Sequence, residues 1–498
     1  MAGSKSGGER GDPGQGGRQP RFVIIGAGMA GVLSAIKLRE AGFGDLAVYE
    51  KGARVGGTWR ENTYAGVACD VPSHLYSYSF APNPDWSHRF SPGAEILEYF
   101  ERVAREHGVE ELIRYDTEIT RCEHDGERWQ IETAKGEHDE ADFVIAATGV
   151  LHHPAYPEIE GLESFEGPCF HSSRWNHELS FEGQRVGVIG TGSSAIQITG
   201  ALAASASKLS LFQRTAQWIM PQENPAYSEQ EQAEFRSDPG TLKALRDEMS
   251  SVFSDNFSNA VIDANSSQMK LIEDLCRANL ENSVTDPELR ERLRPDYRAA
   301  CKRLVISGNF YQAIQHPNAE LVTEAIDCVE AKGVRTRDGR LHELDILVLA
   351  TGFRVDRFLR PIEVIGRDGI TLEEVWKERP SAYLSISIPG FPNLFLLNGP
   401  NGPVGNFSLI DVAELQFSYI MQLVEQVRSG RCSQVSASAA ATRRFDQDRV
   451  EAAKKTVWAT GCRSWYLDDR GIPAVWPWTF DRFREEMASP KLADYEFV

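Results

Sequence analysis

A short apolar run near the start of the chain is followed by a change of hydrophobic period. Residues 21–25 read Arg-Phe-Val-Ile-Ile, which is typical of a buried β-strand, and a helical pattern ends near residue 40. A second apolar run over residues 45–49 ends at Glu50. The turn between the first strand and the helix carries glycine at three positions: Gly26, Gly28 and Gly31. This order predicts a parallel strand–helix–strand unit.

The same pattern recurs in the middle of the chain. Residues 185–189 form an apolar run, and a helical stretch then leads to another run over residues 209–212. The residues of the turn after the first run are Gly190, Thr191, Gly192, Ser193, Ser194 and Ala195. Two such units predict an α/β fold with two Rossmann-like dinucleotide-binding domains.

The residue at the end of the second strand differs between the two units. Glu50 follows Gly31 by 19 positions, whereas Arg214, followed by Thr215, stands 19 positions after Ala195. A carboxylate accepts hydrogen bonds from ribose hydroxyls, and a guanidinium pairs with a ribose 2′-phosphate. We therefore expect FAD in the first unit and NADPH in the second. The alternative for the first unit is a purely structural glycine turn, and the alternative for Arg214 is a solvated surface charge.

Two further apolar strands, residues 143–147 and 346–350, both continue into Thr-Gly and could carry the chain between the two domains. An acidic, helix-compatible region between them predicts a helical insertion. The expected division is a disordered leader (1–20), the FAD-binding domain (21–150 and 353–498), the NADPH-binding domain (151–220 and 300–352) and the insertion (221–299).

Composition and charge restrict the kinds of molecule that the protein is expected to bind. The 498 residues carry a formal net charge of −19, which argues against nucleic acid or an anionic membrane surface. No apolar run approaches the length of a membrane-spanning helix. The eight cysteines are scattered without a CxxC pair, so we expect reduced thiols, no metal site and a cytoplasmic protein. The oligomeric state is left open.

Two ordered motifs resemble those of the Baeyer–Villiger monooxygenases, class B flavoprotein monooxygenases of the flavin-containing monooxygenase group. The fingerprint of this family is matched by Phe165, Gly167, His171 and Trp175, and the final Trp favours this family over N- and S-oxygenating relatives. A second signature spans residues 56–70. The chain departs from the family at Ala65, where Pro is usual, at Asn176, where Pro or Asp is usual, and at Gly402, where Thr is frequent.

The resemblance implies a defined reaction. Reduced FAD would react with O2 to a C4a-peroxyflavin, which attacks a ketone and inserts oxygen beside the carbonyl to give an ester or lactone. By similarity, Arg303 would be the catalytic cation and Asp70 would orient it. An ordinary interface ion pair is the alternative for these two residues.

Similarity to the family also assigns cofactor contacts. The residues expected near FAD are Gly57, Thr58, Trp59, Asp70, Tyr76 and Phe407. The residues expected near NADPH are Arg214, Thr215, Lys302, Arg303 and Trp465. A buried core aromatic is the alternative for Trp465, and Trp476 and Trp478 are expected to pack in the C-terminal region.

His171 is interpreted as a domain-coupling residue, because oxygen insertion beside a ketone needs no proton abstracted from the substrate. Its segment lies where the chain passes between the two expected domains. Two other functions stay open: oxygenation of nitrogen or sulfur centres by the same fold, and an uncoupled NADPH oxidase or redox sensor. The sequence does not identify the ketone.

Overall fold

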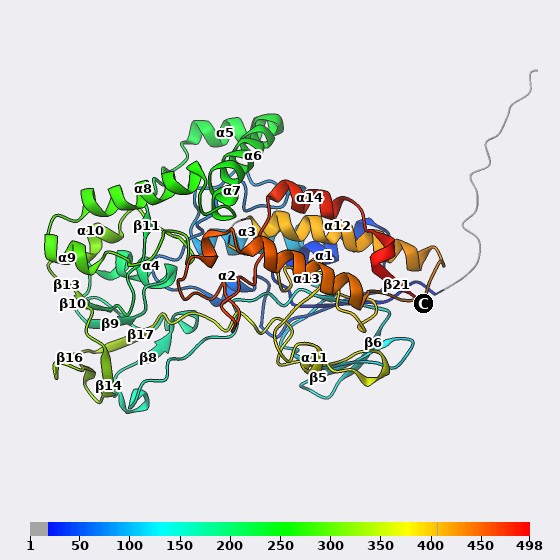
Figure 1. Ribbon diagram of the computed structural model, residues 1–498, viewed down its shortest axis with the longest axis horizontal. Coiled ribbons are helices and arrows are strands. Elements are labelled where there is room, and N and C mark those ends of the chain that lie inside the picture. Colours follow the sequence, from blue (N-terminus) through cyan, green and yellow to red (C-terminus); the bar gives the residue numbers. More distant parts are fainter. Residues whose placement is uncertain (1–17, 406) are drawn as a thin grey trace, which may run out of the picture.

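The computed structural model describes residues 18–405 and 407–498, so residues 1–17 of the expected leader lie outside the described part. Figure 1 shows two lobes, each built on a parallel sheet of five strands. The first sheet has the order β19-β7-β1-β2-β3 and the second has the order β13-β10-β9-β17-β8. Both are parallel throughout, which confirms the expected α/β class. The exact domain boundaries stay a prediction.

The first sheet consists of β1 (Phe22–Ile25), β2 (Leu46–Tyr49), β3 (Ile113–Arg114), β7 (Phe143–Ala146) and β19 (Leu394–Leu396). Alternate side chains of β1 point to opposite faces of the sheet and pack in different hydrophobic clusters. Phe22 and Ile24 pack against the helices of the first lobe, whereas Val23 and Ile25 pack on its opposite face. The helices are α1 (Met29–Glu40), α2 (Thr58–Glu61), α3 (Gly93–Glu106), α12 (Leu409–Arg428), α13 (Ala439–Ala453) and α14 (Phe480–Ala488).

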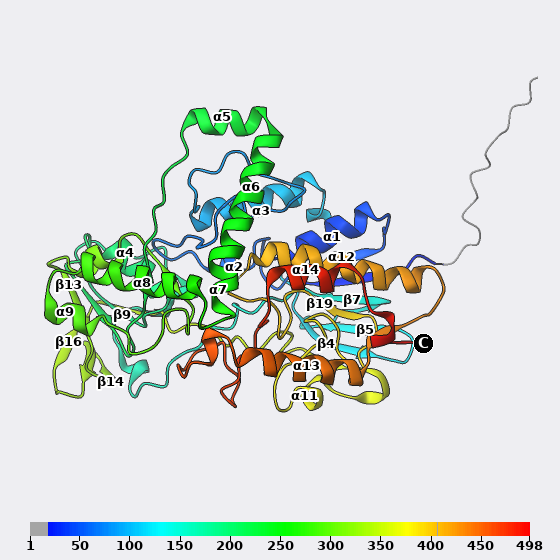
Figure 2. The ribbon, with the colours of Figure 1, turned by 45° about the horizontal axis from the view of Figure 1, so that its top comes forward.

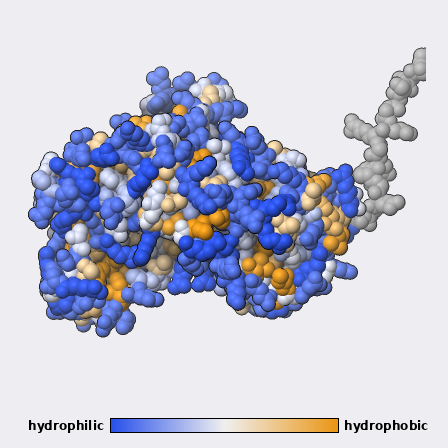
Figure 3. Space-filling view, in the orientation of Figure 1, coloured by the Kyte–Doolittle hydropathy of each residue, from blue (hydrophilic) through white to orange (hydrophobic). Residues whose placement is uncertain are grey.

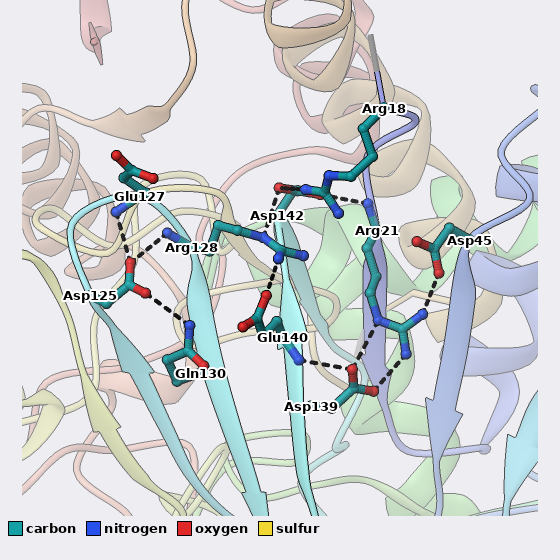
Figure 4. A network of polar contacts seen from close by, with 10 residues as sticks. All are labelled: Arg18, Arg21, Asp45, Asp125, Glu127, Arg128, Gln130, Asp139, Glu140 and Asp142. Carbon is teal, nitrogen blue, oxygen red and sulfur yellow. Dashed lines mark hydrogen bonds and ion pairs between the residues drawn. The ribbon is translucent and has the colours of Figure 1, made fainter. Parts of the chain in front are cut away.

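The opposite face is covered by a four-stranded sheet that the sequence pattern did not predict. Its strands are β4 (Ile119–His124), β5 (Trp129–Thr133), β6 (His138–Ala141) and β18 (Glu363–Ile365), and α11 (Leu372–Val375) follows. Figure 4 shows the ion pairs that fix it to the parallel sheet. Arg21 donates to both carboxylate oxygens of Asp139 at 2.9 and 2.6 Å and pairs with Asp45, while Arg128 Nε lies 3.2 Å from Asp142.

The second sheet consists of β8 (Cys169–His171), β9 (Arg185–Ile189), β10 (Lys208–Phe212), β13 (Ala319–Val322) and β17 (Ile346–Leu349). Val186 and Val188 of β9 pack against α4 (Ser193–Leu202) and α10 (Phe310–Ile314). On the other side lie β14 (Ile326–Glu330), β15 (Gly333–Thr336) and β16 (Leu341–Glu343), which form a small antiparallel sheet. A separate parallel pair joins β11 (Ile219–Met220) to β12 (Val305–Ile306), which begins two residues after Arg303.

The region expected to be a helical insertion contains α5 (Glu229–Ser237), α6 (Pro239–Phe253), a π-helical turn (Ser254–Ser258), α7 (Asn259–Val261), α8 (Ser267–Ser283) and α9 (Pro287–Arg292). Figure 2 shows α6 descending from α5 towards α7. Arg246 of α6 donates to the backbone oxygens of Ser77 and His74 at 2.6 and 3.1 Å and pairs with Asp411 of α12. The insertion therefore contacts the first lobe.

The two segments that join the lobes are paired with each other. The Ala155 N–H donates to the Gly352 carbonyl at 2.9 Å, and the Arg354 N–H donates to the His153 carbonyl at 2.9 Å. Pro154 and Phe353 form the antiparallel bridge between these bonds. The outgoing and returning chains thus run as one hydrogen-bonded ribbon.

The surface seen in Figure 3 is mostly hydrophilic, with small separate hydrophobic patches. Within residues 18–405 and 407–498, no helix combines the length and the apolar character that crossing a bilayer requires. The C-terminal strand β21 (Tyr495–Phe497) pairs with β20 (Val435–Ala437) at the end of the first lobe. Trp476 and Trp478, which precede α14, pack together with ring centroids 4.7 Å apart, as expected.

Candidate functional site

The first glycine turn follows β1 at the centre of its sheet, between β2 and β7. Gly26 has φ +102°, and its N–H donates to the Tyr49 carbonyl at 2.8 Å. A Cβ atom on Gly31 would lie 1.8 Å from the Gly26 oxygen, so α1 can approach β1 only with glycine there. Gly28 is the N-cap of α1 and supplies no side-chain cap. The first N–H groups of α1 are thus available to an anionic ligand.

Glu50 lies beside this turn and is 4% exposed. Its Oε2 accepts a hydrogen bond from the Ala27 N–H at 2.8 Å, and its Oε1 accepts from the Gly52 N–H at 2.7 Å. Arg60 Nη1 donates to the same Oε1 at 2.8 Å. These donors fix the carboxylate directly at the end of β2, where a ribose is bound in folds of this class.

The second glycine turn follows β9, which lies between β10 and β17. Gly192 is the N-cap of α4, again without a side-chain cap, and α4 starts with Ser193, Ser194 and Ala195. Thr191 Oγ1 donates to the Thr215 carbonyl at 2.7 Å and so connects the turn to the end of β10. Gly190 precedes this contact in the turn and has φ +125°. Both lobes therefore present an uncapped helix N-terminus at the carboxyl edge of a parallel sheet.

Two cations lie near the second turn. Arg214 is exposed at the end of β10, and it forms no ion pair with any residue that the structure describes. The Lys302 ammonium lies 4.5 Å from the centre of the Tyr297 ring. Burial lowers the pKa of Lys302, and the charge of Arg214 lowers it further against the opposing effect of Asp296. The effect of Arg214 on Lys302 shows that the two positive charges lie close together. An anion bound here would therefore be attracted by both side chains.

Arg303 and Asp70 form an ion pair although they are 233 residues apart in sequence. Arg303 Nη2 lies 2.6 Å from Asp70 Oδ2, and the side chains are 34% and 21% exposed. The charge of Asp70 is the main cause of a raised pKa of Arg303, and desolvation opposes it. Arg303 thus provides a permanent cation with part of its surface open.

The glycine-tryptophan signature surrounds Asp70. Gly57 is the N-cap of α2 and Thr58 is its first residue. The buried Trp59 indole donates to the Tyr76 hydroxyl at 3.2 Å, and desolvation raises the pKa of Tyr76. The signature therefore brings an aromatic pair to the segment that carries Asp70.

Two aromatic residues expected near a cofactor lie in different surroundings. Phe407 is 4% exposed, and its ring stacks on Phe480 with centroids 4.5 Å apart. Its side chain is part of the core of the first lobe, so a contact with a cofactor would involve its backbone. Trp465 is 38% exposed, which contradicts the alternative of a buried core aromatic.

The fingerprint segment is anchored at the crossing between the lobes. His171 is fully buried at the end of the edge strand β8. Its Nδ1 accepts from the Ser173 N–H at 3.1 Å, so Nε2 carries the proton and donates to the Gly352 carbonyl at 2.9 Å. Burial lowers the pKa of His171, which favours this neutral form. His171 thus joins β8 to the returning segment of the ribbon.

The other fingerprint residues pack around this strand. Phe165 is buried in the cluster that also contains Val329 of β14. A Cβ atom on Gly167 would lie 2.4 Å from the Asp345 carbonyl oxygen, so only glycine permits this approach. The Trp175 ring stacks on Phe181 at 4.9 Å. Their spacing is therefore explained by packing around β8.

The expectation that all cysteines are reduced thiols is wrong for two of them. Cys301 and Cys462 form a disulfide across 161 residues of sequence, two residues before Arg303 and four before Tyr466. The pair carries no local spacing signal, because the fold alone brings these segments together. The other six cysteines are free thiols.

Tyr466 is a site residue that the sequence did not single out. Its side chain is 2% exposed, packs in the hydrophobic cluster that contains Cys301 and Leu304, and interacts with the charge of Arg303. It directly follows Trp465, the residue that similarity to the family placed near NADPH. The structure therefore adds a third polar group to the Arg303–Asp70 pair.

Comparison with known proteins agrees with this geometry. A family model described as "Pyridine nucleotide-disulphide oxidoreductase" matches residues 23–245. A protein of Mycobacterium bovis described as an uncharacterized monooxygenase is 45% identical over 480 residues, 96% of each chain. A Baeyer–Villiger monooxygenase of Streptomyces coelicolor is 40% identical over 484 residues, covering 96% of this chain and 92% of its own.

A solved structure of an enzyme named OTEMO, in complex with FAD and NADP, has the same arrangement over the full fold. It matches with a TM-score of 0.87 and 26% identity, covering 97% of this chain and 100% of its own. The uncapped helix N-termini, the anchored fingerprint and the sequence identity over nearly the full length point to the same assignment. The chain belongs to the Baeyer–Villiger monooxygenase family.

Proposed function

We propose that this protein is an FAD-containing monooxygenase that uses NADPH and O2 to convert a ketone into an ester or lactone. The observation that carries the proposal is the Arg303–Asp70 ion pair at 2.6 Å, held between the two lobes and close to the glycine-tryptophan signature. FAD would supply the oxygen-activating chemistry once reduced by NADPH. We also propose the cytoplasmic location expected from the sequence, which the six free cysteines support.

The first turn fits a dinucleotide with an unmodified ribose. The uncapped N-terminus of α1 can bind a pyrophosphate, and the fixed Glu50 carboxylate can accept from ribose hydroxyls. The second turn, at the N-terminus of α4, fits a nucleotide with an extra phosphate, because Arg214 and Lys302 supply positive charge there. These features support FAD in the first lobe and NADPH in the second.

Arg303 suits the task of stabilising negative oxygen and polarising a carbonyl. Its guanidinium stays protonated, and Asp70 holds one of its terminal nitrogens, Nη2, in place. A preorganised cation of this kind stabilises developing charge without having to reorient during the reaction. Asp70 would act as the positioning partner, and Lys302 would bind the nucleotide.

The proposed function is tested with the purified yellow enzyme. Its absorbance spectrum should be that of bound FAD, and oxidation of NADPH should be accompanied by ester formation from linear, cyclic or aryl ketones, detected by product mass. If hydrogen peroxide accounts for all NADPH consumed with every ketone tested, the assignment as a ketone monooxygenase is wrong.

Glu50→Gln is expected to weaken FAD binding by about 10- to 100-fold, because an amide is a weaker acceptor than a carboxylate and cannot form an ion pair with Arg60. The measurement is the fraction of enzyme that retains FAD after dialysis at low protein concentration. Glu61→Gln is the matched control, since Glu61 pairs with the other terminal nitrogen of Arg60 at 2.9 Å. Equal loss of FAD from both variants would contradict the assignment to Glu50.

Arg214→Ala is expected to raise KM for NADPH by about 10- to 100-fold and to leave KM for NADH within about twofold, because only NADPH carries the 2′-phosphate. Steady-state kinetics with both nucleotides measures the effect. Lys208→Ala is the control, because Lys208 lies at the opposite end of β10 and pairs with Glu320 at 2.7 Å. A parallel change for both nucleotides would show that Arg214 does not read the phosphate.

A further inference from the structure

The loop that carries Tyr466 meets the Arg303 segment at two places. The disulfide between Cys301 and Cys462 joins the two stretches covalently. Four residues further along, Tyr466 packs in the same hydrophobic cluster as Cys301 and Leu304, which flank Arg303, and its hydroxyl lies close to the guanidinium that pairs with Asp70. Arg303 is therefore contacted by two polar side chains that come from segments distant in sequence from its own.

Tyr466 is itself held firmly. Its ring lies 5.5 Å from the Trp458 ring and 4.2 Å from the Trp465 ring. Its carbonyl accepts from the Ala474 N–H at 2.7 Å. Desolvation raises the pKa of Tyr466, with the charge of Arg303 opposing, so the group is a neutral hydroxyl at ordinary pH.

A glycine contact fixes the position of the Tyr466 hydroxyl on its other side. A Cβ atom on Gly405 would lie 2.0 Å from Tyr466 Oη, and Gly405 has φ +89°. Gly405 ends the glycine-rich segment 399–405, two residues before Phe407, which the family resemblance predicts to lie near FAD. The hydroxyl thus occupies the space between the Arg303 guanidinium and this glycine segment.

We propose that Tyr466 is a positioning residue for Arg303. Its hydroxyl accepts a hydrogen bond from the guanidinium and so fixes the plane of the group together with Asp70. A neutral acceptor restrains the cation without cancelling its charge, whereas a second carboxylate would weaken its attraction for negative oxygen. The functional part of this inference rests on the role proposed for Arg303; the contact itself does not.

The functional test is Tyr466→Phe, which removes only the hydroxyl. We expect ester formed per NADPH consumed to fall by about 5- to 10-fold, with the difference appearing as hydrogen peroxide, while KM for NADPH stays unchanged. Tyr383→Phe is the matched control, because Tyr383 is also buried and its hydroxyl lies 2.6 Å from a carboxylate, that of Asp494. Unchanged coupling in Tyr466→Phe would overturn the proposal.

A double-mutant cycle tests the contact without reference to activity. Tyr466→Phe should lower the equilibrium constant for folding by about fivefold in the native background and should have almost no effect in the Arg303→Ala background. Tyr383→Phe should have the same effect in both backgrounds. An effect of Tyr466→Phe that is equal in both backgrounds would overturn the contact. If the cycle shows coupling and no ketone yields ester, the proposed function fails and the contact stands.

Discussion

Replacing Arg303 by alanine is expected to lower the rate of ester formation by about 100- to 1000-fold, the effect of removing about 3–4 kcal/mol of preorganised charge stabilisation. Asp70, whose side chain is 21% exposed, would then lack the partner that it meets at 2.6 Å in the native protein. Reduction of the flavin by NADPH should change far less, because the glycine turns and Arg214 are untouched. Stopped-flow absorbance separates flavin reduction from ester formation measured by product mass.

Two further variants sharpen this test. Arg303→Lys keeps the charge but loses the planar fork, so its rate should lie between the rates of the native enzyme and of Arg303→Ala. Arg298→Ala is the control, since Arg298 is a nearby arginine that pairs with Glu273 at 2.7 Å and contacts the Ala264 carbonyl. Persistent ester formation by Arg303→Ala would rule out Arg303 as the catalytic cation.

Removing the disulfide by the double substitution Cys301→Ala and Cys462→Ala is expected to lower the free energy of unfolding by about 3–5 kcal/mol. The bond joins residues 161 positions apart, and a cross-link that closes so long a loop strongly restricts the unfolded chain. The thermal unfolding midpoint, recorded with and without a dithiol, measures the effect. The dithiol donates two electrons and two protons to the disulfide and is itself oxidised to a disulfide.

The native protein should lose stability on addition of the dithiol, and the double variant should not respond. Cys276→Ala is the control, because Cys276 is a fully buried free thiol in the same hydrophobic cluster. It should respond to the dithiol as the native protein does. A native protein whose midpoint is insensitive to the dithiol would contradict a stabilising role of this bond.

The parts of the fold that follow local rules were predictable from the sequence. Both glycine turns lie where the hydrophobic period changes, and Glu50 lies beside the first of them. The strand–turn–helix–strand pattern occurs twice in the sequence, and this repetition was sufficient to predict the two parallel sheets. The contact of Arg303 with Asp70 came from the family resemblance, because no periodicity relates residues so far apart.

Other features depend on tertiary contacts and could not be predicted in this way. The three-residue strand β8 has no period of its own and is a strand because it pairs with β17. Phe407 was expected near FAD by similarity to the family, but its ring is buried against Phe480, a contact that only the fold creates. The sequence could not identify Cys462 as the partner of Cys301, because only the fold brings the Cα atoms of these two residues to 6.1 Å from each other.

The paired segments between the lobes also determine how the lobes can move. Hydrogen bonds from Ala155 to Gly352 and from Arg354 to His153 make the two crossings one ribbon, and His171 fastens that ribbon to the second lobe. The two crossings cannot slide past each other without breaking both hydrogen bonds, so any relative movement of the lobes has to carry both segments together. The insertion restricts such movement at a second place, because Arg246 binds the first lobe at Ser77 and Asp411.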